Sequence, residues 1–221
     1  MSWSISDYKK KWTTRDFIKA SLGSVHGDVL DYGGGTQKYR GLIESAPNIV
    51  SYKAFDVAQI PGVDLVGDVH ASGLESSSFD SIVCTQVLEH TEKPWQVMQE
   101  INRLCRPNGT VILSVPFLIG YHPCPNDFYR FSFQGVEALC KEWFDLEQGW
   151  TYGGLGQILI ASDEFANEYS YEKFLKIEKP TNKRPSSTLV KKIWSGIYRI
   201  VESIKPMPSI YSNVGCILKK R

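Results

Sequence analysis

The sequence predicts a three-layer α/β fold, with helices on both faces of a mostly parallel β-sheet. Short apolar runs of strand length alternate along the chain with segments whose apolar residues recur at helical spacing. Strands that alternate with helices in this way form parallel βαβ units. The chain has 221 residues, of which 42% are hydrophobic, so we expect one domain with a substantial core.

The elements of the first half follow this alternation in order. Helices are predicted at residues 13–22, 39–45 and 94–105, and strands at residues 25–32, 49–57, 63–69, 79–85 and 109–115. The last of these helices begins with Pro94, which is tolerated at the first helical position. Its apolar residues Val97, Ile101 and Leu104 fall on one face. The sequence RPNG at 106–109 is typical of a turn.

The pattern loosens after residue 116. The segment 116–132, PFLIGYHPCPNDFYRFS, is rich in proline and aromatic residues and indicates a loop. We then expect a helix at 133–143, a strand at 144–152, helices at 157–176 and 187–205, and a last strand at 213–219. The prediction is a single domain over 1–221, with its core at about 13–152 plus 213–219 and a basic, amphipathic helical insertion at 157–205.

The near-neutral chain has a strong charge asymmetry. Its net charge is +1, but residues 1–172 carry 13 basic and 22 acidic side chains, whereas residues 173–221 carry 12 and 2. A basic tail either recruits an anionic partner or packs against the acidic body, and the sequence leaves both interpretations open.

The predicted helix at 187–205 is strongly amphipathic. One face gathers the apolar side chains Leu189, Val190, Ile193, Trp194, Ile197, Ile200, Val201 and Ile204. Such a face either packs on the sheet or on another protomer, or lies on an anionic membrane surface.

Several classes of protein find no support in the sequence. The first residues lack the apolar core of a secretory signal, and no uncharged apolar run approaches the roughly 18 residues that span a bilayer. The five cysteines are scattered and form no CxxC pair, so we expect neither a disulfide framework nor a metal site. The expected location is the cytoplasm, with any membrane contact limited to the inner face.

Three glycines follow the first predicted strand, in VLDYGGGTQKY at 29–39. A P-loop would end in Gly-Lys-Ser/Thr, which this loop lacks. A dinucleotide-binding turn would have a third glycine where Lys38 stands. Asp31, at the end of the strand, opposes a phosphate and favours a ligand with positive charge. S-adenosylmethionine, with a sulfonium, an ammonium and no phosphate, has that character.

From about residue 27 to residue 143, the chain resembles the class I S-adenosylmethionine-dependent methyltransferases of the methyltransferase type 11-like kind. VLDYGGG resembles the first motif of that family, FDSIVCTQVLEH the fourth-strand motif, and LCRPNGTVILSVP the turn into the fifth strand. The resemblance implies a Rossmann-like fold, a seven-stranded sheet with an antiparallel last strand, and S-adenosylmethionine as cofactor. Gln37 departs from the pattern, because many members have a third glycine there.

The resemblance also assigns residues to the cofactor. It implies that Asp56 binds the ribose hydroxyls and that Asp68 and the backbone of Val69 recognise the adenine. The full set that it implies is Asp31, Gly33, Gly35, Asp56, Val57, Asp68, Val69, Gln86 and His90. Taken singly, each glycine is also explained by a tight turn and each acid by an ordinary strand end. Asp31 either touches the ligand or orients backbone amides.

The loop at 116–132 is expected to cover the acceptor side of the site. His122 is the candidate base, because imidazole titrates near neutrality, and Asp127 is a second base or an orienting group. Tyr129 and Arg130 are candidate acceptor-binding residues, Arg130 for a phosphate or carboxylate. The alternative is a lid in which these side chains pack and pair. The segment HPCPNDFYRFS also resembles methyltransferases of glycan and sugar-nucleotide biosynthesis, which implies a sugar hydroxyl as acceptor.

The expected function is methylation of a small-molecule or glycan acceptor at oxygen. Two alternatives stay open: a nucleic-acid or protein methyltransferase, which the basic tail would suit, and a homologue that binds the cofactor without turnover. The acidic body and the lack of an Asn-Pro-Pro-Tyr motif argue against base methylation, so we expect no nucleic-acid partner. Assembly into an oligomer is compatible with the sequence.

Overall fold

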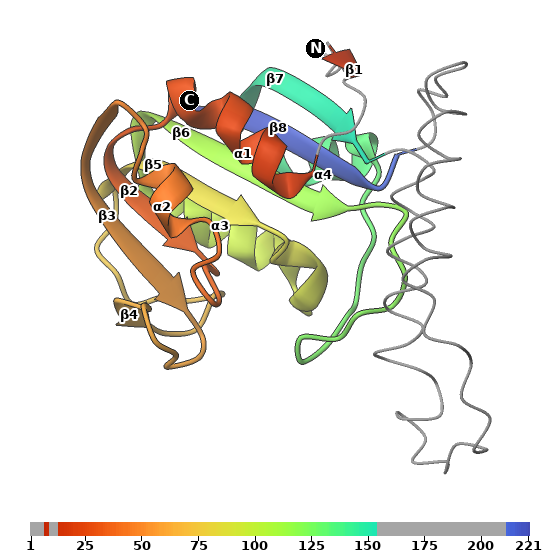
Figure 1. The fold of residues 1–221 in the computed structure, drawn as a ribbon, viewed down its shortest axis with the longest axis horizontal. Helices are drawn as coiled ribbons and strands as arrows, with labels where there is room; N and C mark the ends of the chain where they lie inside the picture. The colour runs from red at the N-terminus through yellow and green to blue at the C-terminus, as the bar shows by residue number, and fades with distance from the viewer. Residues whose placement is uncertain (1–6, 9–12, 154–210) are drawn as a thin grey trace, which may run out of the picture.

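The computed structural model describes residues 7–8, 13–153 and 211–221, which form one sheet with helices on both faces (Figure 1). The strands are β1 (Asp7–Tyr8), β2 (His26–Tyr32), β3 (Asn48–Asp56), β4 (Leu65–Val66), β5 (Phe79–Thr85), β6 (Cys105–Pro116), β7 (Phe144–Tyr152) and β8 (Asn213–Lys220). The helices are α1 (Thr14–Ser21), α2 (Arg40–Ile43), α3 (Pro94–Leu104) and α4 (Phe133–Cys140), with 3-10 turns η1 (Leu22–Ser24) and η2 (Leu88–His90).

The strand order in the sheet is β1-β7-β8-β6-β5-β2-β3-β4. Every neighbouring pair is parallel except the two that involve β8, which runs antiparallel to β6 and β7. The predicted fold, a mostly parallel sheet with an antiparallel last strand, is confirmed, and β1 adds a two-residue edge strand that the sequence did not indicate. The chain order reverses between β2 and β5, and open α/β sheets bind ligands at such a switch point.

Two hydrophobic cores lie on opposite faces of the sheet. In β2, Val29 packs into the core that contains Phe17 of α1, whereas the next residue, Leu30, packs into the core that contains Ile101 of α3. This alternation follows from the two-residue period of a strand. Figure 1 shows α1 and α2 in front of the sheet and α3 behind it, as the three-layer prediction requires.

Local sequence signals set the starts of the helices. The Thr13 hydroxyl accepts the Asp16 amide, and the Asp16 carboxylate accepts the Thr13 amide, so a capping box begins α1. Pro94 opens α3, as its position in the sequence predicts. The Ser132 hydroxyl accepts the Gly135 amide at the start of α4.

Three elements differ in extent from the prediction. The strand predicted at 63–69 is reduced to β4, because the Asp64 carboxylate takes the Ala54 amide that a longer ladder would have used. The helix predicted at 39–45 is reduced to α2, whose four residues include Gly41, a poor helix former. The turn predicted at 106–109 lies inside β6, where Asn108 has a positive φ and the register with β5 shifts.

The predicted helices at 157–176 and 187–205, and with them the helical insertion, lie outside the described residues. Among the helices that the structure describes, none is both long and apolar enough to cross a membrane.

Candidate functional site

The candidate site lies at the carboxyl ends of the parallel strands. The ends of β2, β3, β4, β5 and β6 and the segments that follow them all lie at this edge, and they contain every candidate residue from Gly33 to Arg130. The loop 116–132, after β6, returns across the edge and contacts the segment after β5.

The glycine loop after β2 is held by the end of β3. The amides of Gly33 and Gly34 donate to the carbonyl oxygen of Phe55, at 2.8 and 3.2 Å. Gly33 has φ +76°, and a Cβ atom there would lie 2.4 Å from Cγ2 of Val87, so only glycine fits without a shift. The Gly35 amide donates to Asp56 Oδ2 at 2.9 Å. The structure thus brings Gly33, Gly35 and Asp56 together, as the sequence predicts.

Asp31 lies buried beneath this loop. Burial raises the pKa of Asp31 to about 6, although the hydrogen bond that it accepts from the Tyr52 hydroxyl at 2.7 Å acts in the opposite direction. The same hydroxyl lies 3.0 Å from Gln37 Oε1. Tyr52 belongs to β3, and nothing in the sequence singled it out as a partner of the acid.

Gln37 departs from the family pattern, and its backbone explains how the loop accommodates it. It has φ +60°, a conformation that a glycine adopts freely and a larger residue only at a cost. Its side chain donates to the carbonyl oxygen of Gly35 at 3.2 Å and lies beside Tyr52. These contacts stabilise the left-handed backbone, so the loop keeps its turn without the third glycine.

The residues that follow β3 and β4 are more exposed. Val57 is 56% exposed, and the Asp56 carboxylate also accepts the amide of Ala58 at 3.0 Å. Hydrogen bonds from the His70 amide and ring hold the pKa of the exposed Asp68 carboxyl below its ordinary value. The carbonyl oxygen of the buried Val69 accepts the hydroxyl of Tyr32 at 2.7 Å. Asp68 and Val69 therefore form a fixed corner after β4.

Gln86 directly follows β5, and its polar groups are directed to the neighbouring strand β6. Its amide donates to the carbonyl oxygen of Ser114 at 2.9 Å, and its side-chain nitrogen donates to the Ser114 hydroxyl at 3.2 Å. Gln86 also has φ +57°, which turns the chain sharply into η2. We therefore infer that Gln86 shapes the wall of the site through its backbone.

Glu89, in η2, is a site residue that the sequence analysis did not single out. Its side chain has no exposed surface, and neither carboxyl oxygen has a hydrogen-bond partner among the described residues. Burial raises the pKa of Glu89 to about 8. His90 Nε2 lies 3.7 Å from Glu89 Oε1, and His90 Nδ1 lies 2.7 Å from the carbonyl oxygen of Asn126. The motif VLEH contains Glu89, but only its burial, which is a tertiary property, marks it as unusual.

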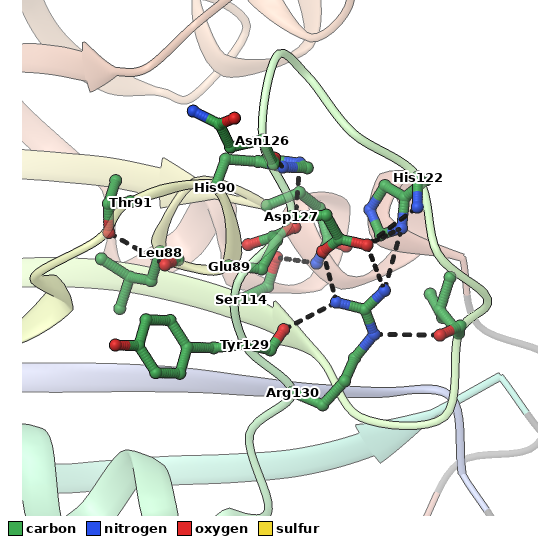
Figure 2. Close-up of polar contacts among 12 residues, drawn as sticks. Leu88, Glu89, His90, Thr91, Ser114, His122, Asn126, Asp127, Tyr129 and Arg130 are labelled. Carbon is green, nitrogen blue, oxygen red and sulfur yellow. Dashed lines mark hydrogen bonds and ion pairs between the residues drawn. The ribbon is translucent and has the colours of Figure 1, made fainter. Parts of the chain in front are cut away.

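Arg130 holds the loop 116–132 together (Figure 2). Its guanidinium pairs with both oxygens of the buried Asp127 and donates to the carbonyl oxygens of Ile119, Gly120 and Tyr129. Burial favours the neutral acid, but the bonds from Arg130 and from the His122 amide hold the pKa of Asp127 below its ordinary value. These contacts match the lid alternative for Arg130.

Tyr129 is anchored in a similar way. Its hydroxyl donates to the carbonyl oxygen of Glu92 at 3.0 Å, and its ring packs against those of Phe128 and Phe131. Its amide and that of Phe128 donate to the carbonyl oxygen of Glu89 at 3.3 and 2.7 Å. The loop is thus docked on η2 by backbone contacts.

His122 lies at the centre of this arrangement. Its Nδ1 is 2.9 Å from the carbonyl oxygen of Gly120 and 3.7 Å from Asp127 Oδ2, and its ring meets that of His90 edge-on, with 5.1 Å between centroids. Burial lowers the pKa of His122, which keeps the imidazole neutral near pH 7. The predicted pair of His122 and Asp127 is thus brought together, and His90 joins it from η2 (Figure 2).

Comparison with known proteins finds a family model that matches part of the chain. Residues 30–113 match the family model described as a methyltransferase domain. A curated relative, an uncharacterized 37.1 kDa protein in transposon TN4556 of Streptomyces fradiae, is 31% identical over 75 residues, which make up 34% of this chain and 22% of the relative. The match therefore spans less than a quarter of that protein's length.

Several solved structures share the fold. A SAM dependent methyltransferase from Archaeoglobus fulgidus aligns with a TM-score of 0.57 at 13% identity, over 94% of this chain and 95% of that chain. Phosphoethanolamine N-methyltransferase 2 of Haemonchus contortus, solved with S-adenosyl-L-methionine, aligns with a TM-score of 0.57 at 15% identity, over 95% and 52%. The [4+2]-cyclase SpnF aligns with a TM-score of 0.57 at 15% identity, over 93% and 79%.

These findings agree with the geometry of the sheet edge. Residues 30–113 match a methyltransferase domain, and the described residues share the fold of S-adenosylmethionine-dependent methyltransferases.

Proposed function

We propose that this chain transfers the methyl group of S-adenosylmethionine to a hydroxyl oxygen of a small-molecule or glycan-type acceptor, with a sugar hydroxyl as the acceptor group. The observation that carries the proposal is the joined glycine loop and Asp56, set at one sheet edge beside the buried cluster of His122 and Asp127. The loop supports a site for the cofactor, and the cluster supports a site for proton removal from the acceptor.

The charges at the edge support a cationic cofactor. Asp31, Asp56 and Asp68 follow or end three successive strands, and carboxylates at these positions attract a sulfonium and an ammonium and repel a phosphate. In this proposal Asp56 accepts the ribose hydroxyls while Asp68 and the Val69 backbone hold the adenine. Gly33, Gly35, Val57, Gln86 and His90 form the remaining walls.

Methyl transfer is a direct displacement at the methyl carbon. The acceptor oxygen attacks that carbon, the carbon–sulfur bond breaks, and S-adenosylhomocysteine leaves with the electron pair on sulfur. The reacting atoms must be held in line at about 3–3.5 Å. An alcohol is a weak nucleophile, so its proton must go to a base, and we assign this role to His122, whose lowered pKa keeps it neutral.

The other loop residues act on His122 or on the loop. Asp127 accepts the His122 amide and the Arg130 guanidinium, so we assign it as a positioning residue. Arg130 donates to carbonyl oxygens of the loop, and the Tyr129 hydroxyl donates to Glu92 after η2, which supports a role in shaping the acceptor surface. We also propose that Tyr129 and Arg130 contact the acceptor, Arg130 where the acceptor carries a phosphate or carboxylate.

Two rival functions are separated by the same set of measurements. The first rival is a nucleic-acid or protein methyltransferase, whose acceptor the basic segment 173–221 would suit. The second is a homologue that binds the cofactor without methyl transfer, and the likeness to a cyclase illustrates that this fold is compatible with reactions other than methyl transfer. Titration calorimetry with S-adenosylmethionine and S-adenosylhomocysteine tests the cofactor. We expect binding that Asp56→Ala weakens at least tenfold and that Lys19→Ala, remote on α1, leaves unchanged; no binding by the wild type would refute the proposal.

An acceptor panel then tests the chemistry. Sugar nucleotides and free glycans are incubated with labelled cofactor, beside RNA, DNA and protein acceptors. We expect transfer to a sugar hydroxyl and a fall of roughly 10²–10⁴-fold in kcat for His122→Ala. Transfer only to nucleic acid or protein would favour the first rival, and cofactor binding without transfer to any acceptor would favour the second.

A further inference from the structure

We propose that Glu89, His90 and His122 bind one divalent first-row metal ion, with Zn²⁺ as the best match. Each of the three side chains offers one ligand atom, and these atoms all lie within 4.8 Å of one another. Two come from η2 and one from the loop 116–132, so the site would join the two segments that enclose the acceptor side (Figure 2). The spacing of the cysteines predicts no metal site, and this cluster contains no cysteine.

Glu89 is the first independent observation in favour of a cation. Its carboxyl group is fully buried, and neither oxygen has a hydrogen-bond partner among the described residues. Buried polar groups are nearly always paired, because an unpaired one loses its hydration without compensation. Arg130, a cation whose charge acts on Glu89, is turned to Asp127 and to the loop carbonyls. A metal ion in the cluster would supply the missing partner.

The two histidines are oriented as metal ligands are. Nδ1 of His90 lies 2.7 Å from the carbonyl oxygen of Asn126, and Nδ1 of His122 lies 2.9 Å from that of Gly120. A carbonyl oxygen only accepts, so in each ring Nδ1 carries the proton and Nε2 carries the lone pair. A ligating histidine usually donates its other ring nitrogen to a carbonyl or carboxylate in this manner.

The tautomer of His122 is fixed because the hydrogens of Arg130 Nη2 are donated to other acceptors. Arg130 Nη2 lies 3.3 Å from His122 Nδ1 and could in principle donate to it. However, Nη2 has two hydrogens, and closer acceptors take both: Asp127 Oδ2 at 2.7 Å and the Gly120 carbonyl oxygen at 2.9 Å. The proton therefore stays on Nδ1, with Gly120 as its acceptor.

The ligand set and the distances indicate which metal would bind. Two imidazoles and one carboxylate form the protein ligands of several catalytic zinc sites, which keep a fourth position open. Metal–ligand bonds of about 2.0–2.2 Å place tetrahedral ligand atoms roughly 3.4 Å apart. Glu89 Oε1 and His90 Nε2 are already 3.7 Å apart, so the closure falls mainly on His122 and its loop.

A metal in this position would change how the acceptor is activated, and this consequence rests on the proposed function. A hydroxyl bound at the open position would lose its proton more readily, because the cation lowers its pKa. His122 would then be a ligand, since one nitrogen cannot hold the metal and accept a proton at the same time. The binding site itself does not depend on the acceptor or on methyl transfer.

The test uses the full chain after removal of metal with a chelator. Zn²⁺ is titrated by calorimetry, and Co²⁺ is titrated while visible absorption is recorded, because tetrahedral Co²⁺ absorbs strongly. We expect one equivalent of each ion, bound at least tenfold more weakly by Glu89→Gln, His90→Asn and His122→Asn. His70→Asn is the matched control, because His70 lies outside the cluster, beside Asp68.

Far-ultraviolet circular dichroism shows that each variant is folded, and S-adenosylmethionine affinity, measured in parallel, separates the two proposals. Weaker Zn²⁺ binding with retained cofactor binding in Glu89→Gln and His122→Asn supports the metal site, even if no acceptor is found. The metal proposal is overturned if the wild type takes up no stoichiometric Zn²⁺, or if the three cluster variants bind it as tightly as His70→Asn does.

Discussion

Replacement of Gly33 by alanine should damage both the stability of the fold and the cofactor site. A Cβ atom at this position would lie 2.4 Å from Cγ2 and 3.0 Å from Cγ1 of Val87, whose side chain is buried after β5. The backbone also has φ +76°, which costs an L-residue about 1–2 kcal/mol. Overpacking against a buried side chain adds about 1–3 kcal/mol. The expected loss in the free energy of unfolding is therefore about 2–5 kcal/mol.

Gly35 provides the matched control for this substitution. It also has a positive φ, +52°, but an added Cβ atom would meet nothing within 4 Å. Gly35→Ala should therefore cost only the backbone part, about 1–2 kcal/mol. Urea denaturation followed by far-ultraviolet circular dichroism measures both variants. The difference between them isolates the clash with Val87.

A double-mutant cycle completes the test. Val87→Ala removes both methyl groups that the new Cβ atom would meet, so Gly33→Ala should cost less in that background by about 1–3 kcal/mol. In the Val87→Ala background, Gly33→Ala should also reduce S-adenosylmethionine affinity by a smaller factor, because the amide of residue 33 can keep its hydrogen bond to the Phe55 carbonyl oxygen. Equal destabilisation by Gly33→Ala and Gly35→Ala, with no coupling to Val87, would refute the reasoning.

Three further predictions concern charged groups. Because the pKa of Asp31 is raised to about 6, S-adenosylmethionine affinity measured by calorimetry should fall roughly tenfold from pH 7 to pH 5 as the carboxylate is protonated. Tyr52→Phe should move that fall to higher pH, because the Tyr52 hydrogen bond lowers the pKa of Asp31. A flat pH profile would contradict the role of Asp31. The hydrogen bonds from Arg103 lower the pKa of Glu100 to about 2, so the stability that the Glu100 carboxylate contributes is present above its ordinary pKa and lost as the pH falls toward 2. In urea denaturation, Glu100→Gln should therefore lower the free energy of unfolding by about 1–3 kcal/mol at pH 7. Near pH 2 the variant and the wild type should differ little. Asp127→Asn removes the charge that pairs with Arg130, so chymotrypsin should cleave at Phe128 and Tyr129 several-fold faster than in the wild type; an unchanged cleavage rate would mean that the clamp does not hold the loop.

The sheet could be predicted because its signals are local. The central strands are apolar runs, and the two-residue alternation in β2 assigns Val29 and Leu30 to opposite cores. The strand predicted at 63–69 is longer than the observed β4, because the prediction used only the local pattern. Its alternation of apolar residues and acids is that of a strand, but Asp64 bonds to Ala54 and the ladder stops after Val66. A side chain that takes the place of a ladder bond is not visible in a hydrophobicity pattern.

The placement of the proposed cofactor-binding residues was predictable for the same reason as the strands. Its groups are the residues that directly follow strand ends, and parallel strands bring such residues to one edge whatever the side chains are. Gly33, Gly35 and Asp56 are connected by backbone amides, so their relation follows from topology. The exception is Gln37, whose left-handed backbone is held by contacts with Gly35 and Tyr52 that depend on the tertiary structure.

The acceptor half depends on contacts between segments that are distant in sequence. His90 reaches the carbonyl oxygen of Asn126, which is 36 residues away, and the carbonyl oxygen of Glu89 accepts the amide of Phe128. These contacts dock the loop on η2, bury Glu89 and turn Arg130 inward to Asp127. A sequence motif names the residue types but not which of them lose water, and desolvation is what raises the pKa of Glu89 and lowers that of His122. In the proposed function, acceptor chemistry depends on residues whose properties are set by docking of the loop, so substitutions at Asn126 or Phe128 should alter acceptor specificity more than cofactor affinity.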